Sequence, residues 1–169
     1  MFAFDPQEPF EYVCRADRDL PADHPGRPRF KLRGLTAKEN ADIQDRVFGG
    51  QAGGSGKKSM GMEVRNGLIE LMTLRRGLIG VENLHRRNPA FTDEHRRQIR
   101  EARETPDAVP PKTPPEFLLV EYETETPAGG RPHVSTRILD MIPADRRTEL
   151  ANAITERGGA LSEDEEGNS

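Results

Sequence analysis

The chain has 169 residues, of which 33% are hydrophobic and 5% aromatic, with no Trp, so its length fits a single domain with a small core. Its formal net charge of -4 argues against a general nucleic-acid coat protein, because such proteins draw their affinity from neutralised phosphates. The sequence shows no secretory-type apolar N-terminus and no apolar run near the ~20 residues of a membrane-spanning helix, so we expect a soluble cytoplasmic protein.

Two short apolar stretches near the N-terminus, Phe10–Cys14 and Phe30–Leu35, predict strands. In the second, Phe30 and Leu32 alternate with charged residues, which is typical of a strand with one buried face. The stretch between them is polar, contains three prolines and predicts a loop.

Two helices are predicted next. Thr36 and Glu39 have the spacing of a capping box, in which each side chain binds a free N–H group at the start of a helix. The first helix ends at Gly49, and residues 49–59 predict a flexible glycine-rich loop. Apolar residues then recur at spacings of three and four from Met60 to Leu84, which predicts a core helix with a break or bend near Gly77 to Gly80.

The following segment is polar and rich in proline. Thr92 is a predicted N-cap for a helix over Asp93–Glu104 that has almost no apolar face, so its stability requires ion pairs or a partner. Residues 106–115 contain five prolines and predict an extended arm.

The C-terminal third predicts two strands and a helix. Phe117–Thr124 and His133–Leu139 are expected to form an antiparallel hairpin with a long loop. Pro143 suits the first turn of the final helix, which ends at Gly158. Its expected buried side consists of Leu150, Ala153 and Ile154.

These elements predict an α+β fold: one small domain of two N-terminal strands, three to four helices and a β-hairpin, with Pro-rich and Gly-rich connectors. The expected segments are 1–48 (strands and capped helix), 49–59 (flexible loop), 60–87 (core helix), 88–116 (polar helix and Pro-rich arm), 117–142 (hairpin), 143–159 (C-terminal helix) and 160–169 (acidic tail).

The sequence contains no complete catalytic or cofactor motif. The glycine-rich run before Lys57 and Lys58 fails as a phosphate-binding loop, because counting back from either lysine reaches no glycine at the first position. The four histidines have no recognised metal spacing. Cys14, the only cysteine, is expected to be a buried structural thiol. We therefore expect a protein that is not an enzyme and has no cofactor and no metal.

An arginine-rich region between residues 75 and 103 is the strongest signal outside the predicted core. It has three interpretations: a solvated, ion-paired face, a protein-docking face, or a nucleic-acid contact. Interspersed carboxylates and the lack of aromatic residues spaced for base stacking disfavour the last. The candidate partner-binding residues are Arg86, Arg87, Arg96, Arg97, Arg100, Phe117, Leu119 and Tyr122.

Four segments carry a resemblance to a known group of proteins: Phe10–Val13, Arg29–Asp45, Leu74–Leu84 and Ile142–Ser169. The pattern that they match is a strand leading into a Leu-Thr-x-x-Glu helix, a later helix running into a Gly-aromatic-x-Asn stretch, and a last helix followed by Leu-Ser-Glu-Glu and Asn-Ser. This order resembles small structural and morphogenesis proteins of tailed bacteriophages, particularly tail-assembly or chaperone-like proteins. Here Val81 replaces the aromatic residue, and residues 88–132 form an insertion.

The resemblance implies a phage structural or assembly protein that acts through protein–protein contacts in the virion. Its partners would be capsid, neck or tail subunits, with several copies in one assembly, no membrane and nucleic acid disfavoured. It would occupy the host cytoplasm during assembly and then the virion. Two alternatives stay open: a tail-assembly chaperone absent from the mature particle, and a nucleic-acid-binding regulator that uses the arginine cluster.

Overall fold

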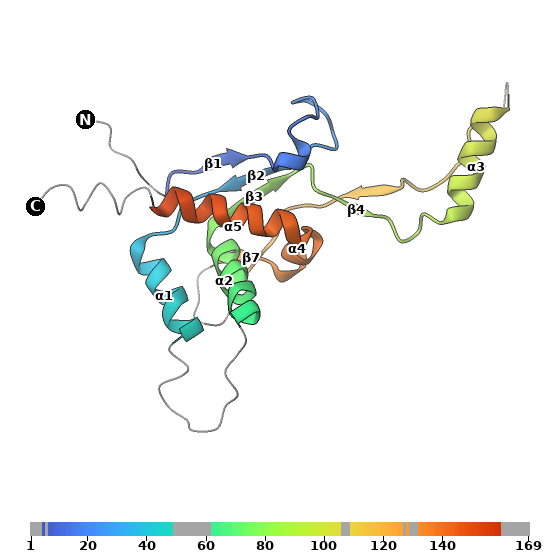
Figure 1. Ribbon diagram of the computed structural model, residues 1–169. Helices are drawn as coiled ribbons and strands as arrows, with labels where there is room; N and C mark the ends of the chain where they lie inside the picture. The colour runs from blue at the N-terminus through green and yellow to red at the C-terminus, as the bar shows by residue number, and fades with distance from the viewer. Residues whose placement is uncertain are drawn as a thin grey trace, which may run out of the picture.

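The computed structural model describes residues 5, 7–48, 62–105, 109–126, 128 and 132–159. It consists of a body and a projecting arm (Figure 1). The expected loop 49–59 and acidic tail 160–169 lie outside the described residues. The elements in chain order are β1 (Phe10–Tyr12), a short 3-10 turn (Arg15–Asp17), β2 (Arg29–Leu32), α1 (Ala37–Phe48), α2 (Met62–Gly77), β3 (Leu78–Glu82), β4 (His85–Arg87), α3 (Asp93–Glu104), β5 (Phe117–Leu119), β6 (Thr124–Glu125), β7 (His133–Val134), α4 (Thr136–Met141) and α5 (Ala144–Gly159).

The body is built on a three-stranded antiparallel sheet in the order β1-β2-β3. Phe10 pairs with Leu32, and Phe30 pairs with Val81. Phe30 and Leu32 are fully buried while Lys31 between them is exposed, so the alternation expected from the sequence is confirmed. The predicted N-terminal strands therefore form, and they supply one wall of the core.

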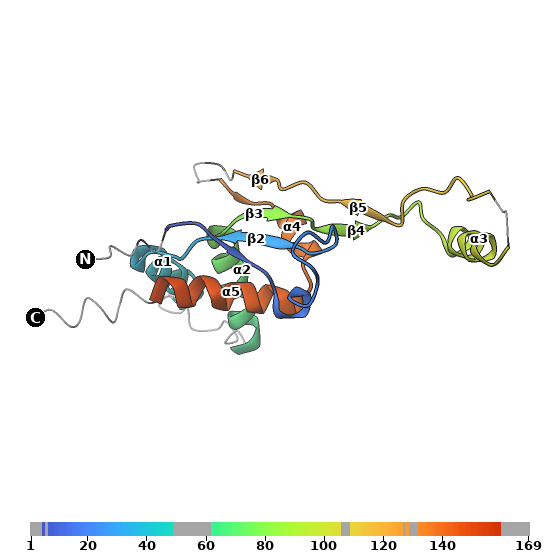
Figure 2. The ribbon, with the colours of Figure 1, turned by 90° about the horizontal axis from the view of Figure 1, so that it is seen from above.

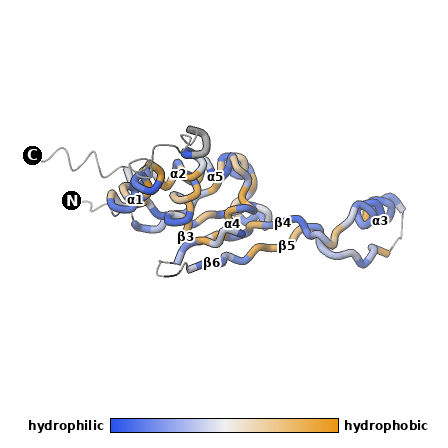
Figure 3. Tube along the Cα trace, turned by 90° about the horizontal axis from the view of Figure 1, so that it is seen from below, coloured by the Kyte–Doolittle hydropathy of each residue, from blue (hydrophilic) through white to orange (hydrophobic). Residues whose placement is uncertain are grey.

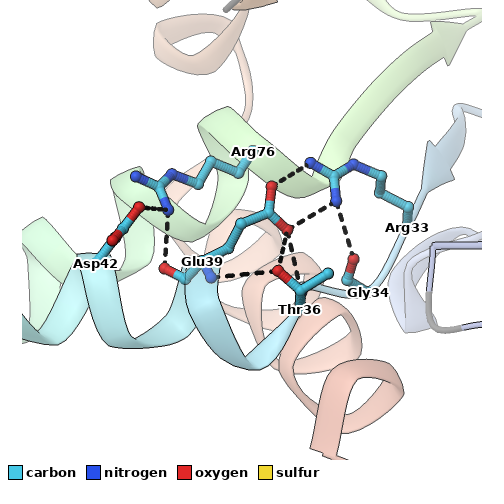
Figure 4. Close-up of polar contacts among 6 residues, drawn as sticks. All are labelled: Arg33, Gly34, Thr36, Glu39, Asp42 and Arg76. Atoms are coloured by element: carbon cyan, nitrogen blue, oxygen red, sulfur yellow. Dashed lines mark hydrogen bonds and ion pairs between the residues drawn. The ribbon is translucent and has the colours of Figure 1, made fainter.

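A polar cluster at the start of α1 joins three elements (Figure 4). The Glu39 amide donates to Thr36 Oγ1 at 3.2 Å and the Thr36 amide donates to Glu39 Oε2 at 3.0 Å, which confirms the capping box. Arg33 donates to the two Glu39 oxygens at 2.8 and 3.0 Å, and Arg76 of α2 donates to the Glu39 carbonyl at 2.8 Å. Chiefly through the Arg33 hydrogen bonds, the pKa of Glu39 falls to about 2.

The prediction of one long core helix over Met60–Leu84 is wrong beyond Gly77, because α2 ends there and β3 begins at Leu78. The predicted break does fall in this region. A Cβ atom on Gly77 would lie 2.6 Å from Ile154 of α5, so only glycine permits this close helix approach. Residues from Leu78 onward gain main-chain hydrogen bonds by pairing with β2, and this long-range pairing outweighs the local helical pattern.

The long hairpin expected over 117–124 and 133–139 is also wrong. β5 pairs with β4 instead, and the only hairpin pairing in this described region is between the two-residue strands β6 and β7. Ser135 caps α4, accepting from the Ile138 amide at 3.3 Å. Ile138 and Leu139 are adjacent and each only 1% exposed, which a strand with one wet face cannot provide but a helix can.

The final helix α5 completes the core. It packs against α2, and both helices lie on one side of the sheet (Figures 1 and 2). Its predicted inner residues Leu150, Ala153 and Ile154 are buried. Among the described residues there are five α-helices, because α4 replaces an expected strand. The α+β fold class is confirmed.

Candidate protein-binding site on the arm

The arm is the segment from His85 to Leu119, of which residues 85–105 and 109–119 are described. It begins just after Asn83, whose φ of 56° is a left-handed conformation that asparagine tolerates better than most residues. This residue separates β3 in the body from β4 in the arm. β4 and β5 form a two-stranded ribbon that projects from the body and has α3 at its far end (Figures 1 and 2).

The ribbon has one exposed apolar row. Its register pairs Arg87 with Phe117 and His85 with Leu119. Side chains alternate across a strand, so Phe117 and Leu119 share a face, and they are 56% and 60% exposed. The two parts of the arm differ in hydropathy: α3 is largely hydrophilic, whereas β5 is hydrophobic (Figure 3). Few large apolar residues elsewhere in the described chain are as exposed.

Asn88 holds the two ends of the arm tip together. Its backbone amide donates to the Glu116 carbonyl at 2.8 Å, and its side-chain amide donates to the Pro115 carbonyl at 2.8 Å. Its side-chain oxygen also accepts from the Ala90 amide at 3.0 Å. Asn88 is only 7% exposed, so these bonds are shielded from water and fix the turn into α3.

Helix α3 is attached by charged and aromatic contacts. Thr92 is its N-cap, and His95 completes the box by accepting from the Thr92 amide. Arg96 binds Glu116 at 2.6 Å and lies 5.8 Å from the centre of the Phe91 ring. The helix itself has no buried residue. As expected, a polar helix is supported by ion pairs rather than by a hydrophobic face.

The predicted arginines differ in their surroundings. Arg87 pairs with Asp93 at 3.7 Å. Arg97 pairs with Glu94 at 2.7 Å and with Glu101 at 3.7 Å. The structure thus places carboxylates beside several members of the arginine cluster, which lowers its effective positive charge.

Three other candidates lie apart from these pairs. Arg100 is exposed on α3, and neither it nor Arg86 forms an ion pair with the described residues. Arg86 is partly buried on the opposite face of the ribbon from Phe117. Tyr122 packs against the core and donates to the Leu78 carbonyl at 3.1 Å, and its burial raises the pKa of its phenol. Tyr122 therefore does not join the exposed apolar row.

Sequence reasoning missed Asn88 and Glu116, which organise the arm tip. The Asn88-Pro89 pair is a turn signal that marks the position, because the residue before proline leaves the helical region and asparagine hydrogen-bonds its own turn. Glu116 carries no local signal, since its role depends on Arg96, which is distant in the sequence but close in space.

A hollow of about 600 Å³ lies where the arm joins the body. Its walls include Pro25, Pro28 and Pro143, together with Leu84 and Phe117. An ion pair between the buried Asp17 and the partly buried Arg146, with a 2.8 Å contact, closes one side. The hollow brings mainly apolar surface next to the exposed row of β5.

Other chemistry finds little support in the described part of the chain. No group of three or more His, Cys, Asp or Glu there is arranged to hold a metal ion. Cys14 is fully buried as expected, although β1 ends at Tyr12, and burial raises the pKa of its thiol to about 12. None of the helices in the described ranges has the length and apolarity to cross a membrane.

Comparison with protein-family models, with curated proteins and with solved structures gives no match.

Proposed function

We propose that this chain is a non-enzymatic assembly protein of a tailed bacteriophage that acts through protein–protein contacts in the head, neck or tail. The contacts are made by the arm. The observation that carries the proposal is the exposed row of Phe117 and Leu119 on a ribbon that projects from the body. The phage setting comes from the sequence resemblance, and the mode of action comes from the geometry.

The energetics of the arm support a docking role. Fully burying a Phe or Leu side chain contributes about 1.5–3 kcal/mol, and more than half of each side chain in this row is exposed. A partner that covers both would gain roughly 2–3 kcal/mol from them. Neither residue stabilises the core at present, so their exposure is a cost that binding would offset.

The electrostatics favour a protein partner over nucleic acid. Arg87, Arg96 and Arg97 already have carboxylate partners, so binding phosphates would require breaking those pairs. Arg100 remains for a contact with a partner's carboxylate. In a gel-shift titration with duplex DNA, we expect no salt-sensitive binding.

The decisive experiment is quantitative mass spectrometry of purified phage particles that carry this gene. A structural role predicts the chain in a fixed ratio to capsid or tail subunits. Its absence from particles, together with co-purification with a tail protein from infected cells, would instead support the chaperone alternative. Absence from particles and from every complex with phage proteins would refute an assembly role.

A matched pair of variants tests whether the arm makes the contact. Leu119→Ser removes apolar surface from the arm, whereas Leu71→Ser removes a leucine that is 37% exposed on α2. We expect the first to lower incorporation or co-purification at least ~10-fold, the equivalent of ~1.4 kcal/mol, and the second to leave it unchanged. Equal effects of both would place the contact elsewhere.

A further inference from the structure

Strand β5 has an open edge. The Val120 amide donates to the Leu84 carbonyl at 2.7 Å, and the Asn88 amide donates to the Glu116 carbonyl at 2.8 Å. In an antiparallel pair, residues that exchange hydrogen bonds alternate with residues whose main-chain groups point away. Positions 116, 118 and 120 therefore face β4, and the N–H and C=O groups of Phe117 and Leu119 face the other side.

Nothing in the described residues pairs with that side of β5. Within these residues β4 is its only strand neighbour, and Figure 2 shows the strand on the outer side of β4. The same two residues thus present free main-chain groups at the edge and exposed apolar side chains on the face. An edge of this kind is a template for adding a strand.

The edge is complementary to itself. If a second β5 lies antiparallel about Leu118, Phe117 of each copy stands opposite Leu119 of the other. These two pairs exchange four main-chain hydrogen bonds and join four apolar side chains into one cluster. Shifting the pairing centre to Leu119 would set Phe117 opposite the Glu121 carboxylate, which is less favourable.

The charges on the ribbon permit this arrangement. Arg87 and His85 of each copy lie on the outer strands β4, so they flank the apolar cluster instead of facing each other. The two copies of Arg87 would lie about three strand spacings apart, or ~14 Å, which exceeds the Debye length at physiological salt. Like charges therefore do not oppose pairing.

The surroundings of β5 limit the pairing to one added strand. Pro114 and Pro115 precede the strand and lack amide donors, so the hydrogen-bonded edge cannot extend past Glu116. Pairing about a two-fold axis also occupies the β5 edge of both copies, so a third chain cannot add a strand to either β5.

We infer that the partner of the arm is a second copy of this chain, joined edge to edge through β5 into a four-stranded sheet in the order β4-β5-β5-β4. The inference rests on the proposed role of the arm as a contact surface and names its occupant. The contact is small, so it belongs to the weak class of interfaces that gain strength when several copies are held in one assembly.

Cross-linking tests the register. Leu118 lies on the two-fold axis at a position where antiparallel Cα atoms are ~4.5 Å apart, within the range a disulfide spans. Under mild oxidation, Leu118→Cys is expected to form a disulfide dimer at least ~10-fold faster than Val109→Cys, although Val109 is 87% exposed and collides more freely. Equal rates, or a faster rate for Val109→Cys, would overturn the inference. Native Cys14 is fully buried and is common to both variants.

Sedimentation equilibrium of the full chain tests the edge independently of any cysteine. The wild-type mass is expected to rise towards the dimer as concentration approaches ~1 mM, the range of a weak contact. Leu119→Pro removes an outward amide that β4 does not use, and it is expected to stay monomeric. Leu119→Ala keeps that amide and is expected to retain part of the association.

A wild-type chain that stays monomeric throughout, or a Leu119→Pro variant that dimerises as well as wild type, would overturn strand pairing between copies. Such a result would leave the proposed assembly function intact, because that is measured separately by the presence of the chain in particles. Conversely, dimerisation of the pure protein with no chain in any phage complex would refute the function alone.

Discussion

Replacing Glu39 by glutamine removes the carboxylate charge at the start of α1 and keeps the length of the side chain. Arg33 then loses its ionic partner, while the amide oxygen of glutamine can still accept from Thr36. The pKa of Glu39 is about 2, well below its ordinary value of 4.5. A difference of ~2.5 pKa units at 1.36 kcal/mol per unit corresponds to a stabilisation on the order of 3 kcal/mol at neutral pH. The carboxylate side chain is only 16% exposed, so solvent screens this interaction little.

The sign of the pH dependence follows from the lowered pKa. The unfolded chain binds a proton at Glu39 near pH 4.5, whereas the folded chain resists protonation until about pH 2. The stabilisation is therefore complete above ~pH 5, shrinks as the pH falls through the window between these values, and is absent below about 2. The difference between wild type and Glu39→Gln should follow the same course.

Urea unfolding followed by circular dichroism at pH 7, 5, 4, 3 and 2 measures this difference. At pH 7 we expect Glu39→Gln to lose ~3 kcal/mol, or roughly 6–12 °C in melting temperature for a domain of this size. Glu94→Gln, whose side chain is 50% exposed in an ion pair on α3, is the control and should change stability by less than ~1 kcal/mol. A loss below 1 kcal/mol at pH 7, or a loss that stays constant down to pH 2, would refute the role assigned to the Arg33–Glu39 pair.

Three further substitutions or probes test the packing of the body. Gly77→Ala should destabilise the fold by about 1–3 kcal/mol in urea unfolding, because the new Cβ lies 2.6 Å from Ile154, whereas Gly67→Ala meets nothing within 4 Å and should stabilise α2 by up to ~1 kcal/mol. With a thiol pKa of about 12, Cys14 should be inert to Ellman's reagent at pH 8 and should react only when the chain unfolds in urea. Ser135→Ala removes the cap of α4 and should cost ~1 kcal/mol in the same unfolding assay, while Ser135→Asn should retain most of it.

Local signals in the sequence were sufficient where one short segment determines its own conformation. The capping box of Thr36 and Glu39 and the alternation around Phe30 both depend on residues within a few positions of each other. The final helix was predicted for the same reason, since Pro143 and the apolar side of 144–159 specify its start and orientation. These features account for most of the body.

Sequence reasoning failed where a distant partner decides between helix and strand. Residues 78–82 continue the apolar spacing of α2, but β2 offers an edge that the spacing does not reveal. Three of the four residues at 136–139 are β-branched or apolar and resemble a strand, yet Ser135 caps a helix there. Periodicity alone does not separate short apolar helices from strands.

The candidate site shows the same division. Phe117 and Leu119 were predicted from the apolar strand that contains them, and they do share an exposed face. Tyr122 was grouped with them, although it follows Leu119 by three positions, an odd offset that does not return to the same face, and its side chain packs on the core. The choice of β4 as the partner of β5 was invisible in the sequence, because His85–Arg87 has no apolar pattern.

Apolar side chains are distributed differently in the body and in the arm. The body encloses its own core, in which Phe30, Leu150 and Ile154 are fully buried. The body therefore has a hydrophobic interior despite the low hydrophobic content of the chain. The arm tip, in contrast, is held by polar groups such as Asn88 and Arg96. Because those contacts already fix the tip, Phe117 and Leu119 are not needed to stabilise the arm. Large apolar residues that the fold does not use, placed on an open strand edge, are what an intermolecular contact requires.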